Sequence, residues 1–160
     1  MNVIDALRRT DRAPLQRLLA ETGYFTEDEL AIAFELIDIV LDRPEQKDYV
    51  ISVCRGGDAV LGYYCVGPTP ATESTYDLYW IAVAPSMHGK GIGKALISHA
   101  EQLICARGGR LVVAETSSRP QYEKTRRFYR SCGYTELAQI KGYYRPGDDL
   151  VVFGKYLSQL

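Results

Sequence analysis

The stretch LYWIAVAPSMHGKGIGKALISHAEQLI, residues 78–104, changes character twice along its length. An apolar run is followed by a glycine-rich segment, after which apolar residues return at helical spacing. This order predicts a strand over 75–83 and a helix over 91–107, joined by a turn. Glycines let successive N–H groups point into one concavity beside the positive end of the helix dipole. The turn suits a pyrophosphate group, with Lys90 and Lys94 as outer partners, and a plain flexible turn is the alternative.

Two familiar nucleotide-binding motifs do not fit this glycine spacing. A Walker A loop requires GxxxxGK followed by Ser or Thr, but Gly89 and Gly93 are too close together and Ala95 follows Lys94. A dinucleotide-binding fingerprint requires GxGxxG at the start of a βαβ unit, whereas the spacing here is GxGxG and no such unit begins the chain. The spacing therefore excludes both the P-loop enzymes and the common dinucleotide-binding proteins.

The remaining periodicity predicts a mixed α/β fold in a single domain over 1–160. The predicted order is α-α-β-β-β-α-β-α-β-β, antiparallel at first and with one crossover helix in the middle. A capping box at Thr26 and Glu29 begins the second helix, and Gly23 ends the first. The other elements are a helix from about Asp11, a hairpin over 48–67, a strand over 110–116, a helix over 121–133, and strands over 134–140 and 149–157.

Composition and charge narrow the class of protein. The chain has 160 residues, 46% of them hydrophobic, and a net charge of −1, so no overall charge attracts nucleic acid or an anionic membrane. No apolar run approaches the ~20 residues of a membrane helix, and early charges interrupt any signal peptide. The four cysteines form no CxxC pair, and the chain has only two histidines, too few to favour a zinc site with several ligands. We expect a cytoplasmic protein with reduced thiols and with no metal, nucleic-acid or membrane partner.

Residues 78–104 resemble motif A of the GNAT superfamily of acyl-CoA-dependent N-acyltransferases. That motif is an apolar strand, a V-x-P turn, then [QR]-x-x-G-x-[GA] and a helix; His88 stands in the Gln/Arg position, and Gly91 and Gly93 in the two small positions. The segment RRFYRSCGY, residues 126–134, is similar to the family's FYxxxGF segment. The resemblance covers residues 76–134 by motif and the remainder by topology. It implies a mixed, mostly antiparallel central sheet, splayed between its two middle strands and flanked by about four helices.

The resemblance also implies how acetyl-CoA is bound. The pantetheine arm would pair with the end of the strand over 75–83, and an N–H at or next to Val83 would polarise the thioester carbonyl. The pyrophosphate would bind the N–H groups of residues 88–93. His88 is uncommon at its position, and Tyr122 replaces the asparagine usual in the family. The full set is Ile81, Ala82, Val83, His88, Gly89, Lys90, Gly91, Ile92, Gly93, Lys94 and Tyr122.

The implied chemistry is direct attack of an amine on the acyl carbonyl, in which positioning the two reactants supplies much of the acceleration. Tyr129 matches the tyrosine that donates a proton to the leaving thiolate in many relatives, although it could equally be a core aromatic residue. A general base must accept the proton of the amine. Asp77, Glu115 and Glu73 are the candidates; the alternatives are that Asp77 caps a turn and that Glu115 is a solvated strand end.

The acceptor amine is not fixed by any motif. Seven of the 12 tyrosines fall in the regions that form the family's variable acceptor pocket, and four carboxylates lie near them in sequence. The tyrosines are Tyr24, Tyr63, Tyr64, Tyr76, Tyr79, Tyr143 and Tyr144, and the carboxylates are Glu35, Asp38, Asp77 and Glu115. This grouping favours a cationic amine, whereas Lys141 and Arg145 would suit the acidic group of an amino acid. We expect an N-acetyltransferase acting on a primary amine of a small molecule or amino acid. The alternatives are a protein N-terminal or lysine acetyltransferase and a non-catalytic acyl-CoA sensor, and a homodimer is one option for the assembly.

Overall fold

Seven strands form one sheet in the order β1-β2-β3-β4-β5-β7-β6 in the computed structural model, which describes residues 1–158. The parallel pair is β4 with β5; β1 with β2, β2 with β3, β5 with β7 and β6 with β7 are antiparallel. The strands are β1 Asn2–Ala6, β2 Val50–Gly56, β3 Ala59–Pro68, β4 Thr75–Val83, β5 Leu111–Ser117, β6 Thr135–Arg145 and β7 Asp148–Tyr156. The helices are α1 Arg12–Thr22, α2 Glu27–Asp42, α3 Ile92–Ala106 and α4 Glu123–Ser131. The predicted mixed, mostly antiparallel fold with four helices is confirmed.

The chain divides into two compact units. The first comprises Met1–Gly67 and Trp80–Ala100, and the second comprises Pro68–Tyr79 and the chain from Glu101 onward. Strand β4 and helix α3 each contribute residues to both units. Each unit is described by itself below.

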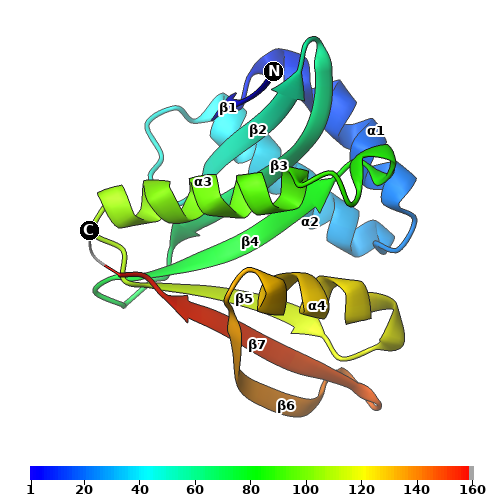
Figure 1. Cartoon of the computed structure of the whole chain (residues 1–160), viewed down its shortest axis with the longest axis vertical. Coiled ribbons are helices and arrows are strands. Elements are labelled where there is room, and N and C mark those ends of the chain that lie inside the picture. Colours follow the sequence, from blue (N-terminus) through cyan, green and yellow to red (C-terminus); the bar gives the residue numbers. More distant parts are fainter. Residues whose placement is uncertain (159–160) are drawn as a thin grey trace. The chain divides into compact units, whose positions relative to one another are not determined.

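In the first unit, α1 and α2 cover one face of β2 and β3, and the part of α3 up to Ala100 lies on the other face (Figure 1). Leu15 and Leu19 of α1, Ile37 of α2, Val53 of β2 and Tyr63 of β3 are almost completely buried between these helices and the strands. The apolar face of α1 is therefore packed into the core.

Both helix boundaries predicted in this unit are confirmed. The Thr26 hydroxyl accepts a hydrogen bond from the Glu29 N–H, and the Glu29 carboxylate accepts one from the Thr26 N–H, so the capping box is complete. Gly23 ends α1 with a φ of 77°, a left-handed conformation that glycine adopts without strain.

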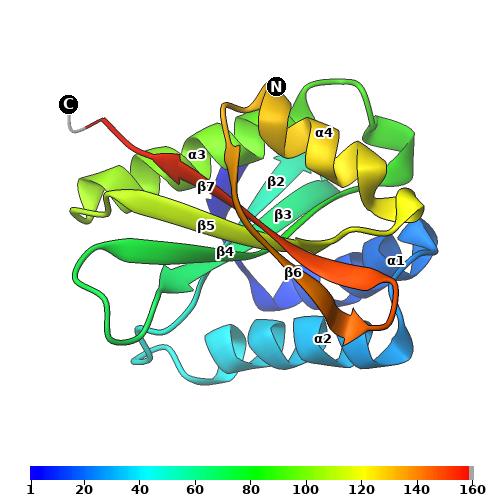
Figure 2. The ribbon, with the colours of Figure 1, turned by 90° about the horizontal axis from the view of Figure 1, so that it is seen from below.

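In the second unit, α4 lies on one side of β5 and β7 (Figure 2). The ring of Tyr129 from α4 packs against Phe153 of β7, with 5.6 Å between the ring centroids. A buried polar network joins the end of β5 to the start of β7: the Ser117 hydroxyl donates to the Asp148 carboxylate, and Arg126 donates to the Ser117 carbonyl over 2.6 Å. These bonds satisfy polar groups that would otherwise be costly to bury.

Two elements differ from the sequence prediction. Strand β1 was not predicted, because its five residues are held by backbone pairing with β2, from Asn2 with Gly56 to Ala6 with Ser52, and carry little pattern of their own. Strand β6 continues to Arg145, although the predicted strand ended at residue 140. Its register with β7 is irregular between Ile140 and Arg145, so a bulge lies in the part of the strand that was not predicted.

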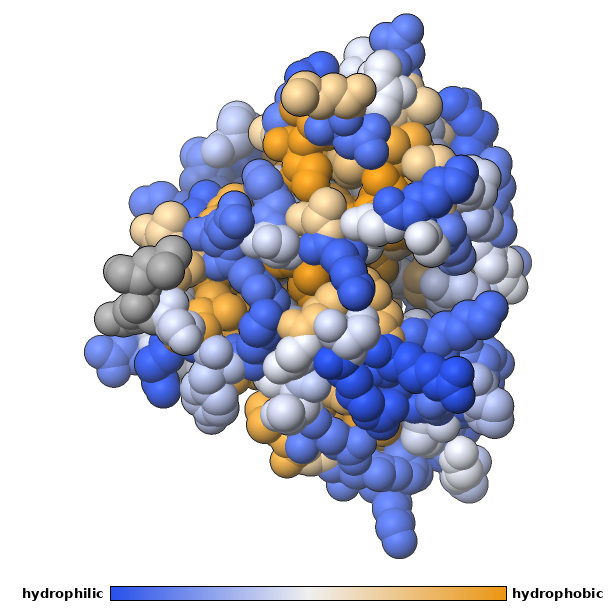
Figure 3. All heavy atoms as spheres, viewed as in Figure 1, coloured by the Kyte–Doolittle hydropathy of each residue, from blue (hydrophilic) through white to orange (hydrophobic). Residues whose placement is uncertain are grey.

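The surface mixes hydrophilic and hydrophobic side chains, and hydrophilic residues predominate on the face seen in Figure 3. Strand β6 is exposed along its whole length, and its large apolar side chains are Leu137, Ile140, Tyr143 and Tyr144. Among residues 1–158, none of the helices has both the length and the apolar character required to cross a membrane.

Candidate active site

The predicted glycine turn lies between the end of β4 and the start of α3. Gly89 and Gly91 have φ values of 75° and 82°, in the left-handed region that residues with a side chain rarely adopt. A Cβ atom added to either glycine would meet no atom within 4 Å. The backbone conformation, and not crowding, therefore requires glycine at these two positions, and the space over them is open.

The N–H groups of this turn fall into two classes. Those of Ile92, Gly93 and Lys94 belong to the first turn of α3, where N–H groups have no acceptor within the helix; the Ala95 N–H is the first to donate back, to Gly91. By contrast, the His88 and Lys90 N–H groups donate over 3.3 Å to carbonyls of the turn that precedes the helix. The first turn of α3 therefore offers the N–H groups best placed for an anion.

The His88 side chain contacts the end of β4. Its Nε2 atom lies 2.9 Å from the Val83 carbonyl oxygen, and because a carbonyl can only accept, Nε2 carries the proton. The next N–H along the chain, that of Ala84, donates to the Leu61 carbonyl over 2.9 Å. The peptide group between Val83 and Ala84 is thus held on both sides, by a side chain from the glycine turn and by β3.

Sequence reasoning missed one residue that shapes the end of β4. A Cβ atom on Gly62 of β3 would lie 2.7 Å from the Ala82 carbonyl oxygen and 3.3 Å from the Val83 Cα atom. Glycine at this position allows β3 and the end of β4 to approach closely. The available signal was a glycine inside an otherwise apolar strand, which often marks a close backbone approach.

Two of the three predicted base candidates interact electrostatically in the second unit. Asp77 of β4 is paired in register with Val113 of β5, and Glu115 lies two residues further along β5. The Asp77 carboxylate accepts a hydrogen bond from the Thr69 hydroxyl over 2.8 Å. Although Glu115 is exposed as a residue, partial burial of its carboxyl group raises its pKa, and the negative charge of Asp77 adds to this effect. Glu73, the third candidate, is exposed in the loop before β4.

The two predicted tyrosines of the α4 region are buried. Tyr129 lies within an aromatic cluster, 5.7 Å from the ring of Tyr134 and 5.6 Å from that of Phe153. Tyr122 lies before α4, with the Arg119 guanidinium 5.9 Å from the centre of its ring. Burial in an aromatic cluster restrains the Tyr129 ring, as either a core or a catalytic role would require.

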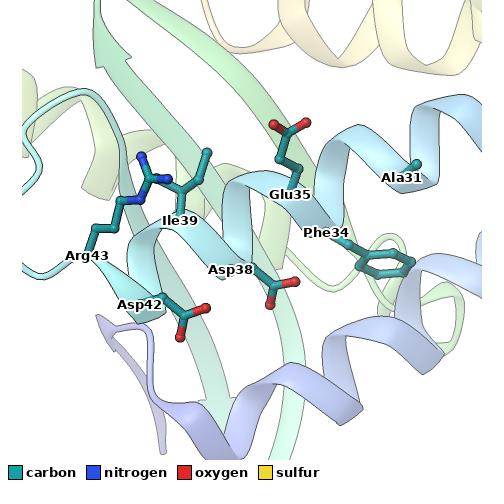
Figure 4. Close-up of a pocket in the computed structure, with 7 residues that line it drawn as sticks. All are labelled: Ala31, Phe34, Glu35, Asp38, Ile39, Asp42 and Arg43. Carbon is teal, nitrogen blue, oxygen red and sulfur yellow. The ribbon is translucent and has the colours of Figure 1, made fainter.

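One side of α2 lines an open pocket. Asp38 and Asp42 point toward the segment that contains α1, and Glu35 points away from it (Figure 4). Arg12 Nε lies 2.6 Å from Asp38 Oδ1, and the hydrogen bond from Arg12 lowers the pKa of Asp38. The Asp38 carboxylate is therefore paired with Arg12, and both side chains of the pair are exposed. The lining residues are Ala31, Phe34, Glu35, Asp38, Ile39, Asp42 and Arg43.

The tyrosines in the predicted acceptor regions include both buried and exposed residues. Tyr63 and Tyr64 of β3 are buried in the first unit and belong to its core. Tyr143 and Tyr144 of β6 are exposed, with perpendicular rings 5.1 Å apart. The bulge that carries them is held by Asp149, which accepts hydrogen bonds from the Gly142 N–H and the Gln139 amide. Within the described part of the chain, no three His, Cys, Asp or Glu side chains group as metal ligands.

Comparison with known proteins tests the resemblance carried by residues 78–104. The model of the acetyltransferase (GNAT) domain matches residues 47–136, more than half of the chain. The N-alpha-acetyltransferase RimI of Mycobacterium tuberculosis is 34% identical over 94 residues, which are 57% of this chain and 55% of RimI. The matched segment thus spans about half the length of that curated relative.

Solved structures extend the likeness to the whole chain. A GNAT-family protein from Desulfovibrio desulfuricans is 38% identical, with a TM-score of 0.95 over 99% of this chain and 100% of that one. The fold is also that of yncA from Salmonella typhimurium, solved with its cofactor acetyl-CoA, at 20% identity and a TM-score of 0.77 over 100% of this chain and 96% of that one. The family model and the full-length likeness together show that this chain belongs to the GNAT family of acetyltransferases.

Proposed function

We propose that the protein transfers an acetyl group from acetyl-CoA to a primary amine of a small molecule or a free amino acid. The observation that carries the proposal is the turn between β4 and α3. It combines left-handed glycines, open space above them and the first-turn N–H groups of a long helix. Such a combination binds a phosphate group through backbone donors and the helix dipole.

In this proposal, the N–H groups of Gly89, Gly91 and the first turn of α3 bind the pyrophosphate of acetyl-CoA. Lys90 and Lys94, both exposed, would supply positive charge at its rim. Residues 81–83 at the end of β4 would pair with the amides of the pantetheine arm, and Tyr122 would contact the cofactor in place of the family's asparagine. These assignments follow from the family motif as it stands in this sequence.

The proposed chemistry uses one backbone donor and two side chains. The amine attacks the thioester carbonyl carbon, and the Val83 N–H stabilises the negative charge that develops on the oxygen. We take Val83 and not Ala84 because the Ala84 N–H already donates to Leu61. As the tetrahedral species collapses, the C–S bond breaks, Tyr129 donates a proton to the thiolate, and Glu115 accepts the proton of the amine.

Glu115 is preferred to Asp77 as the general base. A raised pKa makes a carboxylate a stronger base and brings it closer to the pH at which the enzyme works. Asp77 instead accepts a hydrogen bond from Thr69 and contributes the charge that helps to raise the pKa of Glu115. Asp77 would then tune the base and not act as one.

A protein N-terminus is the second candidate acceptor. It is favoured by the 34% identity to RimI, an N-alpha-acetyltransferase, and by the exposed Tyr143 and Tyr144 on the anchored bulge of β6. Exposed aromatic rings suit an extended peptide as well as a small cation. The two candidates differ in the length of acceptor that the site must hold.

Release of CoA thiol from acetyl-CoA, measured with a panel of acceptors, tests the proposal. The panel contains primary amines, free amino acids and short peptides with free N-termini. Turnover with a small amine or amino acid supports the first candidate, and turnover only with peptides supports the second. Binding of acetyl-CoA without turnover of any acceptor would identify the protein as a sensor and would refute the enzymatic proposal.

A further inference from the structure

The geometry points to His88 as a positioning residue that fixes the peptide group beside the oxyanion donor, and this inference rests on the function proposed above. We propose that the hydrogen bond from His88 Nε2 to the Val83 carbonyl, at 2.9 Å, couples the phosphate-binding turn to the acyl end of acetyl-CoA. His88 itself is not assigned a contact with the reacting atoms. It acts through the backbone of Val83.

The turn between β4 and α3 explains how His88 reaches back over five residues. The Met87 N–H donates to the Ala84 carbonyl over 2.8 Å, and the His88 N–H donates to the Pro85 carbonyl over 3.3 Å. These bonds close the short helix Pro85–Met87, and the chain returns toward the end of β4. The imidazole of His88 then meets the Val83 carbonyl, while Gly89 continues into the phosphate-binding turn.

The opposite edge of the same peptide group is held by β3. The Ala84 N–H donates to the Leu61 carbonyl over 2.9 Å. The peptide plane between Val83 and Ala84 is therefore held by one hydrogen bond on each side, to Leu61 and to His88. Only the φ and ψ angles at the Val83 Cα atom separate this peptide plane from the Val83 N–H. Holding the plane therefore restrains the direction in which the Val83 N–H points, which is the requirement for a preorganised oxyanion donor.

The chemistry of the bond defines the informative substitutions. The bond needs a side-chain N–H donor that can reach the carbonyl, which the neutral imidazole provides with its proton on Nε2. Glutamine also offers an N–H donor, and it is one of the two residue types in the family motif that His88 replaces. Leucine fills similar space without any donor. His88 is exposed, so neither substitution disturbs the core.

The test compares wild type, His88→Gln and His88→Leu, with acetyl-CoA labelled with carbon-13 at the acetyl carbonyl as the probe. Isotope-edited infrared spectroscopy measures the carbonyl stretch of bound probe, which falls in frequency when an N–H donor polarises the carbonyl. Calorimetry gives the Kd, and the melting temperature without ligand checks the fold. None of these measurements requires the acceptor to be known.

We expect the stretch to fall on binding to wild type and to His88→Gln, and to return toward the free value in His88→Leu. If the bond from the Val83 N–H to the acyl carbonyl is lost as a result, the Kd should be roughly 5- to 10-fold higher in His88→Leu. If His88→Leu has a higher Kd but the same carbonyl stretch as wild type, His88 is a phosphate contact and the inference is overturned. The same Kd and the same stretch in all three proteins would also overturn it. Failure of wild type to bind the probe would instead refute the proposed function.

Discussion

The hydroxyl group of Tyr64 and the Nδ1 atom of His99 lie 2.8 Å apart, so the middle of β3 is bonded directly to α3. Tyr64 is completely buried, and His99 lies two turns into the helix that begins beside the glycine turn. The bond helps to hold this helix against β3, together with buried residues such as Leu96, and so supports the N–H groups at its start. A contact remote from the predicted cofactor thus helps to place the site.

Replacing Tyr64 with phenylalanine should destabilise the protein. The substitution keeps the ring but removes the hydroxyl partner of the half-buried His99 ring, which should lower the free energy of unfolding by about 1–2 kcal/mol. Urea denaturation followed by circular dichroism measures the change. Tyr156→Phe is the matched control because that tyrosine is 62% exposed. Equal denaturation midpoints for the two variants would show that the Tyr64 bond contributes nothing.

Gly91→Glu should abolish the rise in melting temperature that acetyl-CoA causes by binding the folded state. The new carboxylate would repel phosphate, and its Cβ atom would occupy the open space over the turn. Gly57→Glu is the control: Gly57 also has a positive φ, of 61°, and open space around it, but it lies in the β2–β3 hairpin. The control should lose similar stability and keep the ligand-induced shift. A shift retained in Gly91→Glu would mean that the phosphates bind elsewhere.

Asp77→Asn should move the acid limb of the pH profile of kcat/KM to lower pH. A general base works only when deprotonated, so if Glu115 is the base, its raised pKa makes activity fall at a higher pH than for an ordinary glutamate. Removing the negative charge of Asp77 lowers that pKa, and the limb should follow it. Initial rates between pH 5 and 9 measure the effect, with Asp58→Asn, an exposed hairpin residue, as the control.

Glu115→Gln completes this test. If Glu115 is the base, this variant should lose about 10²- to 10⁴-fold in kcat, the usual contribution of a general base, while it still binds acetyl-CoA. Full activity of Glu115→Gln together with an inactive Asp77→Asn would assign the base to Asp77.

Tyr129→Phe should lower kcat by about 10²-fold or more while leaving the Kd of acetyl-CoA unchanged, because the hydroxyl is proposed to act only on the leaving thiolate. The ring contacts with Tyr134 and Phe153 remain, so the fold should be retained. Steady-state kinetics and calorimetry separate the two effects. Unchanged turnover would leave Tyr129 as a core residue with no part in catalysis.

The four cysteines should react with a thiol reagent in two classes. Burial raises the pKa of Cys65 to about 12 and also raises that of Cys54, so little thiolate is present at pH 8. Cys105 and Cys132 are only partly buried and should be modified first. Mass spectrometry after timed labelling with iodoacetamide measures the order, and labelling in urea should reach all four. Modification of Cys65 as fast as Cys132 would contradict the buried environment.

Local signals predicted the helices and most strands because each depends on neighbouring residues. Each of these signals lies within a short stretch of sequence. Examples are the Thr26 capping box, the left-handed Gly23 and the strand-turn-helix of residues 78–104. The same is true of the glycine turn, whose composition reflects the φ values that Gly89 and Gly91 adopt.

The features that were missed depend on residues far apart in the chain. Strand β1 exists because β2 pairs with it, and the Asp38 carboxylate is occupied by Arg12, 26 residues away. The contact between His88 and Val83 spans only five residues, but it requires the intervening turn to fold back. No periodicity or spacing encodes such pairings, so the sequence alone did not show that Asp38 pairs with Arg12.

Gly62 has a consequence for how this protein can change during evolution or engineering. At Gly89 and Gly91 a side chain would find space but would strain the backbone, whereas at Gly62 it would collide with the Ala82 carbonyl. A mutational scan should therefore find all three positions intolerant, although β3 carries no cofactor contact in our proposal. A library meant to broaden the acceptor range should leave Gly62 constant, because this single missing methyl group determines how closely two strands approach.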